Sequence, residues 1–243
     1  MRSQFTHHDG VRLHYLDSGG ESGEDDRRAP IVFVPGMTCL AHDYEAVLPE
    51  FGRRTVVVEV RGHGRSDAPV DGYDLETLSG DVGAVVDAVT DGPVHIVTFS
   101  RGTSAAVLWT LGNAARVRSL SIGDYVPEEK LVPDDAVRWL LDGKWRGTPV
   151  RDRLDEKAAL LTFQAAQERS FWEPLAQSGI PLLAVRSPES QVIIPDEVWD
   201  RYARLFPTAQ LVEFADSPHD IFRPDRARYP RLVAEHVDRA DRR

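Results

Sequence analysis

The serine at position 100 has the setting of a catalytic nucleophile. An apolar run over residues 94–99 ends at Ser100, and the chain continues directly into a stretch typical of a helix, beginning at Gly102. A serine at such a junction sits on a tight, exposed turn at a helix N-terminus. Backbone N–H groups there can stabilise negative charge that develops on a reacting oxygen. Ser100 is therefore the candidate nucleophile.

The sequence around this serine matches the usual nucleophile motif only in part. A sharp strand-to-helix turn needs small residues two positions either side of the serine, and glycine usually fills both places, giving G-x-S-x-G. Gly102 fits this pattern, whereas Thr98 replaces the first glycine. A serine that only caps the helix N-terminus is the alternative interpretation of the same residues.

Alternating strands and helices are expected to position this turn. Residues 4–17 predict a β-hairpin, and the apolar runs at 31–34 and 55–60 predict central parallel strands. Leucine and valine recur at helical spacing over residues 75–89. Further strands are expected at 117–122, 180–185 and 211–214. This alternation predicts an α/β fold with a mainly parallel sheet that helices cover on both faces.

The alternation stops between residues 126 and 178, where the pattern is helical. An insertion at this place is expected to form a lid over the carboxyl ends of the strands, where the sites of open α/β sheets lie. The insertion is rich in aromatic residues, and packing of the lid on the sheet would account for most of them. The candidates for lining an apolar substrate pocket are Trp139, Trp145, Phe163 and Trp172, together with Gly36 outside the insertion.

Composition narrows the classes of protein and partner. The chain has 243 residues and a formal net charge of −10, which argues against a nucleic-acid partner because nucleic-acid binders usually present a basic surface. Its one cysteine, Cys39, cannot form an internal disulfide and is expected to be a small buried residue. No apolar signal core or membrane-length run is present in the sequence, so we expect a cytoplasmic enzyme with no membrane partner. The eight histidines show no zinc-type pairing, and no metal is expected.

Three segments together resemble the α/β-hydrolase superfamily, and the likeness extends over essentially the whole chain. They are the VPGM segment at 34–37, the RGHGRSD segment at 61–67 and the serine turn. The resemblance, to the serine-nucleophile type with a short helical cap, implies a mostly parallel sheet of eight strands flanked by helices. It implies a core of residues 1–125 and 179–243, with a helical cap of residues 126–178 between the sixth and seventh strands. It also implies the chain order nucleophile, acid, histidine.

The resemblance places the catalytic histidine after the last strand, where this chain has His219. An imidazole with an ordinary pKa near ~6.5 can accept the serine proton and return it to a leaving group. The family often carries the acid after the seventh strand, but residues 186–192 have serine or glutamine where aspartate is expected. Asp124, at the end of the sixth strand, resembles the acid of those relatives that place it there. We therefore expect Asp124 to be the acid, with Glu189 as the alternative.

The resemblance also implies an oxyanion hole made by the backbone N–H groups of Met37 and Arg101, with Gly36 beside them. Met37 is otherwise a flexible apolar residue beside the pocket. The guanidinium of Arg101 is expected to pair with a protein acid. Contact with a substrate carboxylate is the alternative.

These residues predict a cofactor-independent serine hydrolase that cleaves a small-molecule ester, lactone or thioester through an acyl-enzyme. The substrate is expected to be partly apolar. A non-acylating lyase, cyclase or carbon–carbon bond hydrolase on the same fold is the alternative, because Thr98, Pro35 and the vacated acid position depart from the usual pattern. A non-catalytic ligand-binding protein is the third hypothesis. The sequence determines neither the substrate nor the oligomeric state.

Overall fold

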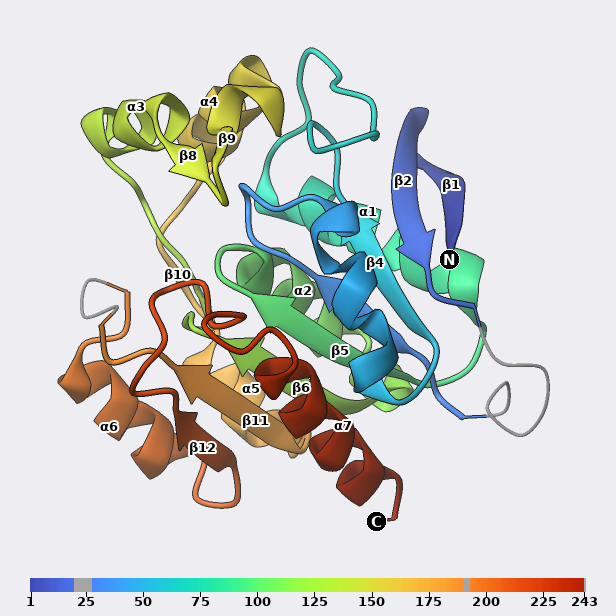
Figure 1. Cartoon of the computed structure of the whole chain (residues 1–243), viewed down its shortest axis with the longest axis vertical. Coiled ribbons are helices and arrows are strands. Elements are labelled where there is room, and N and C mark those ends of the chain that lie inside the picture. Colours follow the sequence, from blue (N-terminus) through green and yellow to red (C-terminus); the bar gives the residue numbers. More distant parts are fainter. Residues whose placement is uncertain (20–27, 190–192, 243) are drawn as a thin grey trace.

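The computed structural model describes residues 1–19, 28–189 and 193–242, and an eight-stranded sheet runs through its centre (Figure 1). The strands of this sheet are β1 (Arg2–His8), β2 (Val11–Asp17), β3 (Ile31–Val34), β4 (Thr55–Glu59), β5 (Val94–Phe99), β6 (Val117–Gly123), β11 (Leu182–Arg186) and β12 (Gln210–Glu213). Their spatial order is β1-β2-β4-β3-β5-β6-β11-β12. β2 pairs antiparallel with β1 and β4, and all other neighbours are parallel.

Helices cover both faces of the sheet. The α-helices are α1 (Leu75–Val89), α2 (Gly102–Gly112), α3 (Asp134–Asp142), α4 (Glu156–Ala165), α5 (Trp172–Ser178), α6 (Asp196–Leu205) and α7 (Arg228–Asp241). The 3-10 segments are η2 (Ala41–Phe51), η3 (Ala114–Arg116) and η4 (Val150–Asp152). One buried cluster joins η2 and α7 to the sheet, and a second joins α1, α2, α5 and α6 to its opposite face. The predicted α/β fold with a mostly parallel eight-stranded sheet is confirmed.

Helix α1 illustrates how the sequence produces these layers. Asp74 precedes the helix, and its carboxylate accepts a hydrogen bond from the Thr77 amide at 2.9 Å, which satisfies one of the unpaired donors of the first turn. The valines at 82, 85 and 86 share one face at helical spacing and are fully buried against the sheet. Removing this apolar surface from water is what holds the helix on the sheet.

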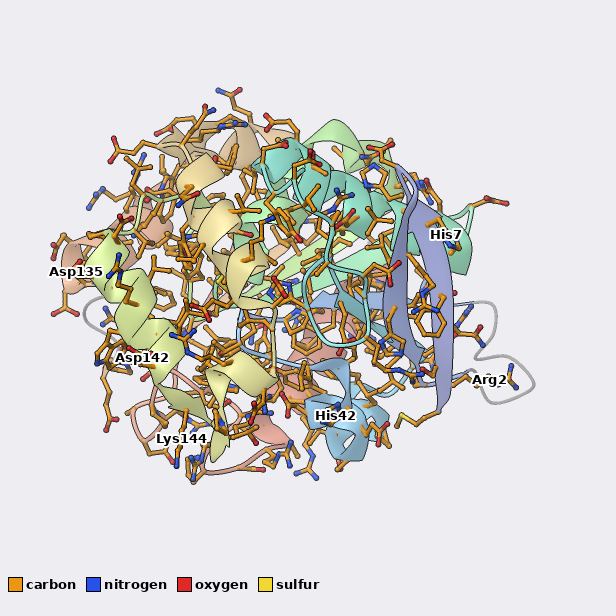
Figure 2. All side chains as sticks on the ribbon, turned by 90° about the horizontal axis from the view of Figure 1, so that it is seen from above. Arg2, His7, His42, Asp135, Asp142 and Lys144 are labelled. Carbon is orange, nitrogen blue, oxygen red and sulfur yellow. The ribbon has the colours of Figure 1, made fainter. Side chains whose placement is uncertain are left out.

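The segment between β6 and β11 forms a small body of its own. A two-stranded ladder of β7 (Glu128–Glu129) and β10 (Arg169–Ser170) closes its base, and β8 (Lys144–Trp145) pairs with β9 (Thr148–Pro149). α3, η4 and α4 enclose an apolar cluster that includes Val137, Leu141 and Phe163. α3, α4 and the β8–β9 hairpin gather at the upper left of Figure 1, and Asp142 and Lys144 lie on the opposite side of the molecule from His7 of β1 (Figure 2).

Backbone hydrogen bonds attach this segment to the loop after β4. The Asp155 amide donates to the Gly62 carbonyl at 2.9 Å, and Leu154 forms a β-bridge with His63. α5, by contrast, packs on the sheet, because Trp172 and Leu175 belong to the cluster under α1 and α2. None of the helices in the described ranges is both long and apolar enough to cross a membrane.

His95 on β5 gives a testable pH dependence of stability. Its ring is fully buried, Nδ1 lies 2.8 Å from the Ser119 hydroxyl, and Nε2 lies 3.1 Å from the Arg53 guanidinium. Burial, together with the Arg53 charge, lowers the pKa of His95 to about 4. In the unfolded chain the ring titrates near its ordinary pKa of 6.5. Between pH 6.5 and 4, His95 is therefore protonated in the unfolded state but stays neutral in the folded state.

We expect the free energy of unfolding to fall as pH drops from 6.5 towards 4, with a contribution from His95 that approaches about 1.4 kcal/mol per pH unit. Urea unfolding at pH 7, 6 and 5 measures this slope. The His95→Gln variant should show a shallower slope than the wild type, whatever its absolute stability. Equal slopes for the two proteins would contradict the buried neutral histidine.

Candidate active site

Ser100 occupies a strained turn between β5 and α2. Its φ angle is +53°, in the left-handed region that non-glycine residues rarely adopt, and its amide donates to the Gly123 carbonyl at 2.9 Å. The start of α2 lies directly against the loop after β3. A Cβ atom on Gly102 would lie 2.2 Å from the carbonyl oxygen of Pro35, so only glycine allows this approach. The turn thus presents the Ser100 side chain at the carboxyl end of the central strand.

Thr98 fits at the position where the usual motif has glycine. Its side chain is fully buried, and its hydroxyl lies 2.8 Å from the Thr103 hydroxyl in the first turn of α2. Tyr229 of α7 donates to the Thr98 carbonyl at 3.0 Å. The threonine is therefore accommodated by hydrogen bonds on both sides of the turn, and the turn forms without the first glycine.

The structure brings together Ser100, His219 and Asp124. His219 Nε2 lies 2.9 Å from Ser100 Oγ, and His219 Nδ1 lies 2.7 Å from Asp124 Oδ2. Asp124 is fully buried at the end of β6, and its other carboxylate oxygen accepts from the Ser187 amide at 2.7 Å. A buried carboxylate bound in this way favours the tautomer with the proton on Nδ1, which leaves Nε2 free to accept the serine proton.

Glu189, the alternative acid, takes no part in this chain of hydrogen bonds. It is exposed in the turn after β11, while the Ser187 amide from the same segment holds Asp124. Residues 190–192 of the expected acid segment lie outside the described residues. Among the candidate acids that are described, Asp124 alone contacts the imidazole.

Two aromatic rings fix the orientation of His219. Phe99, the last residue of β5, stacks on the imidazole with ring centroids 5.1 Å apart and planes 28° apart. Trp145, from the β8–β9 hairpin, presents its ring edgewise with centroids 6.2 Å apart. The sheet and the inserted segment thus both contact the imidazole, whose side chain keeps 27% of its surface exposed.

The loop after β3 lies against the serine turn. A Cβ atom on Gly36 would lie 2.9 Å from Ser100 Cβ, so glycine lets the loop that carries Met37 lie directly against the nucleophile, which Arg101 follows in the chain. No acceptor for either amide lies among the described residues. Two unpaired N–H donors beside a nucleophile are what an oxyanion hole requires.

Two charged residues that the sequence analysis missed hold this loop. Arg153 of the inserted segment donates to the Thr38 carbonyl at 2.6 Å, and Glu59 at the end of β4 accepts from the Ala41 amide at 2.7 Å. Burial alone would raise the pKa of Glu59, but hydrogen bonds from His14 and two backbone amides hold it below its usual value. In the sequence, a carboxylate at the end of an otherwise apolar strand could have indicated a structural role for Glu59. No comparable sequence feature indicates one for Arg153.

A cavity runs beside the serine turn, with about 650 Å³ of empty space counting its open mouth. Gly36, Met37 and Arg101 line it next to the turn, and Glu129 and Thr162 line it from the inserted segment. Its remaining walls combine aliphatic side chains of β3, β4, α1 and α2 with the polar side chains of Glu59, His63, Tyr73 and Ser104. Ser100 borders the cavity through Gly36 and Arg101 rather than lining it. The site therefore combines an apolar chamber with a few polar groups, as small-molecule sites do.

Two aromatic residues expected at the pocket lie elsewhere, so those two predictions are wrong. Trp172 is fully buried against Tyr202, at a ring distance of 4.5 Å, because α5 begins after the β7–β10 ladder has closed the insertion. Trp139 is 79% exposed, because it lies on the outer face of α3 while Val137 and Leu141 face inward. Trp145 contacts His219, and Phe163 contacts Arg101, but neither lines the cavity.

Other reactive groups near the site are held in inert forms. Burial raises the pKa of the Cys39 thiol to about 11, so this cysteine stays protonated at neutral pH. His63 is buried, and its Nδ1–H donates to the Arg61 carbonyl at 3.0 Å. Burial also lowers the pKa of His63, so its ring is neutral. No group of residues suited to hold a metal ion occurs in the described parts of the chain.

Comparison with known proteins also identifies the α/β-hydrolase fold. A family model for the alpha/beta hydrolase fold matches residues 29–122. A non-heme chloroperoxidase from Streptomyces lividans is 32% identical over 123 residues, 49% of this chain and 43% of the relative. A soluble epoxide hydrolase from a Corynebacterium species is 29% identical over 133 residues, 52% of this chain and 44% of the relative. The matched region thus spans less than half the length of each of these two relatives.

The crystal structure of an esterase from a Rhodococcus species superposes with a TM-score of 0.79 at 19% identity. The superposition covers 98% of this chain and 99% of that one, and it shows the shared fold. The chain therefore has the α/β-hydrolase fold, and its residues 29–122 match the model of that family.

Gly36→Ala tests the contact between the loop and the serine turn. The added Cβ would press on Ser100 Cβ, so we expect turnover of 4-nitrophenyl acetate to fall about 100-fold, the scale of loss that a small misplacement of reacting groups produces. The matched control is Gly112→Ala at the end of α2, where a Cβ meets no atom within 4 Å. Wild-type turnover in the folded Gly36→Ala protein, with circular dichroism as the check on folding, would show that the loop does not position the serine.

Proposed function

We propose that this protein is a cofactor-independent serine hydrolase that cleaves a small-molecule ester, lactone or thioester through an acyl-enzyme. The observation that carries the proposal is the continuous chain of hydrogen bonds from Ser100 Oγ through His219 to the buried Asp124. The segment 126–178, which bears α3, α4 and the β8–β9 hairpin, acts as a cap over this site. Its Trp145 contact with His219 and its Arg153 contact with the loop after β3 support that role.

In the first half of the reaction, Ser100 Oγ forms a bond to the carbonyl carbon of the substrate while its proton passes to His219 Nε2. The carbonyl oxygen gains negative charge and accepts hydrogen bonds from the Met37 and Arg101 amides. Asp124 stabilises the imidazolium that forms. The tetrahedral intermediate then collapses, the bond to the leaving oxygen or sulfur breaks, and His219 donates its proton to that atom.

In the second half, a water molecule takes the place of the leaving group. His219 accepts a proton from the water as its oxygen bonds to the acyl carbon, and the same amides hold the oxyanion. Collapse releases the carboxylic acid and returns the proton to Ser100 Oγ. The overall reaction consumes one water and requires no redox partner.

The departures from the usual motif do not favour non-acylating chemistry. Thr98 is accommodated by hydrogen bonds to Thr103 and Tyr229, and Pro35 lies one residue before Gly36 and needs no amide for the proposed oxyanion hole. The vacated acid position is matched by Asp124 at the end of β6. Each departure has a local structural counterpart that leaves the serine, the histidine and the two amides in place.

Ser100→Ala tests the proposal most simply. The variant lacks the attacking oxygen, so we expect turnover of a panel of 4-nitrophenyl esters and lactones of graded size to fall to background. Covalent labelling by a fluorophosphonate should disappear with it. Intact-mass measurement of the labelled wild type should show one adduct. Undiminished turnover and labelling in the variant would refute the assignment of the nucleophile.

Asp124→Asn tests the choice of acid. Asparagine cannot hold the imidazole in the same tautomer or stabilise its charged form, and we expect kcat to fall on the order of 10⁴-fold. Glu189→Gln is the matched control and should retain wild-type kcat, because Glu189 is exposed and makes no contact with His219. A large loss in Glu189→Gln with little loss in Asp124→Asn would reverse the assignment.

A further inference from the structure

Among the residues that the structure describes, the Arg101 guanidinium has no acidic partner. Arg101 follows the nucleophile directly and lines the cavity beside it. Its Nη1 donates to the Lys130 carbonyl at 3.4 Å, its guanidinium carbon lies 4.5 Å from the centre of the Phe163 ring, and it hydrogen-bonds the Tyr125 hydroxyl. None of these three contacts carries a negative charge. Within the described ranges, no carboxylate lies in ion-pair distance of it, so the expected pairing with a protein acid is wrong.

Other arginines in this chain differ from Arg101 because they form ion pairs with carboxylates. Each buried arginine in the described residues has a carboxylate within ion-pair distance. These arginines are Arg53, Arg61, Arg153 and Arg186. That pairing is what burial of a charge requires, because an unpaired charge loses its hydration without compensation. Arg101 is half-buried at the wall of the cavity, and it lacks the carboxylate partner that these four arginines have in the described residues.

The two acids that line the same cavity, Glu59 and Glu129, form ion pairs with His14 and Arg169 rather than with Arg101. Glu129 lines the same cavity and is 4% exposed, but its Oε2 lies 3.2 Å from Arg169 Nε, and it is not in ion-pair distance of Arg101. Burial raises the pKa of Glu129, although the charges of Arg169 and Arg101 act to lower it. The guanidinium, with five N–H donors, therefore keeps most of its hydrogen-bonding capacity for a group that enters the cavity.

We propose that Arg101 binds a free carboxylate on the substrate, so that the preferred substrates are esters that carry a carboxylate joined to the scissile carbonyl by a short apolar linker. A guanidinium recognises a carboxylate through charge-assisted, often paired, hydrogen bonds. The aliphatic cavity walls, which include Val34, Val58 and Leu75, match the linker. This inference rests on the proposed hydrolase function and names its substrate class. One residue would then hold the oxyanion with its amide and the carboxylate with its side chain.

The test compares two substrates of nearly equal shape, 4-nitrophenyl hydrogen glutarate and its neutral methyl-capped counterpart. The measured quantity is the ratio of their kcat/KM values. In the wild type we expect a ratio of about 10 to 100 in favour of the carboxylate, the range that charge-assisted hydrogen bonds provide, and a decrease of this ratio at high salt. In Arg101→Gln the ratio should fall to about 1. Arg101→Lys keeps the charge without the paired geometry and should give an intermediate ratio.

Lys130→Met is the matched control. It removes one positive charge next to the Arg101 contact but leaves the Lys130 carbonyl and the guanidinium in place, so the wild-type ratio should persist. Should Arg101→Gln fail to fold, inhibition of neutral-ester cleavage in the wild type supplies the second measurement. Glutarate should compete, and glutaramide should not.

The outcomes distinguish the carboxylate site at Arg101 from the proposed serine hydrolase activity on which it rests. A wild-type ratio near 1, an unchanged ratio in Arg101→Gln or equal inhibition by glutarate and glutaramide would overturn the carboxylate site, while ester cleavage itself would stand. Absence of Ser100-dependent cleavage of both esters would overturn the proposed function instead.

Discussion

The left-handed turn at Ser100 is the constraint on which the site depends. A serine with φ of +53° exists only if neighbouring segments hold it there, and two glycines make this possible. Gly102 lets α2 begin against the Pro35 carbonyl, and Gly36 lets the next loop lie against the serine itself. The parallel strands then bring the ends of β3, β5 and β6 to one edge. The nucleophile, the loop that holds Gly36 and the acid Asp124 meet there because their strands are neighbours in the sheet.

Paired charges and buried hydrogen bonds stabilise the loops at this edge. Asp124 loses all contact with solvent but gains the Ser187 amide and His219, and Glu59 is held by a histidine and two amides. Arg153 likewise connects the inserted segment to the loop after β3, because its guanidinium donates a hydrogen bond to the Thr38 carbonyl. Removing one member of such a set leaves the other buried and unsatisfied, so these contacts fix geometry more than they add stability. Arg101 differs, since no carboxylate in the described part of the chain pairs with its charge at the cavity wall.

Much of this arrangement could be predicted from the sequence because it depends on local patterns. The apolar run at 31–34 coincides with β3, and the order of strands and helices gives the parallel sheet that brings Ser100, Asp124 and His219 to one edge. The aromatic residues of the insertion could not be placed, because position in the sequence does not show which face of a short helix is covered. Trp139 lies on the outer face of α3, whereas Trp172 belongs to the core. Arg153 and the unpaired state of Arg101 depend on contacts between distant segments, which no periodicity records.

The structure of the phosphonylated protein tests the spatial claim most directly, because a phosphonate mimics the tetrahedral intermediate in place. We predict phosphorus bonded to Ser100 Oγ, one phosphonyl oxygen within hydrogen-bond distance of both the Met37 and Arg101 amides, and His219 Nε2 directed at the leaving-group position. An adduct on another residue, or a phosphonyl oxygen turned away from both amides, would contradict the account.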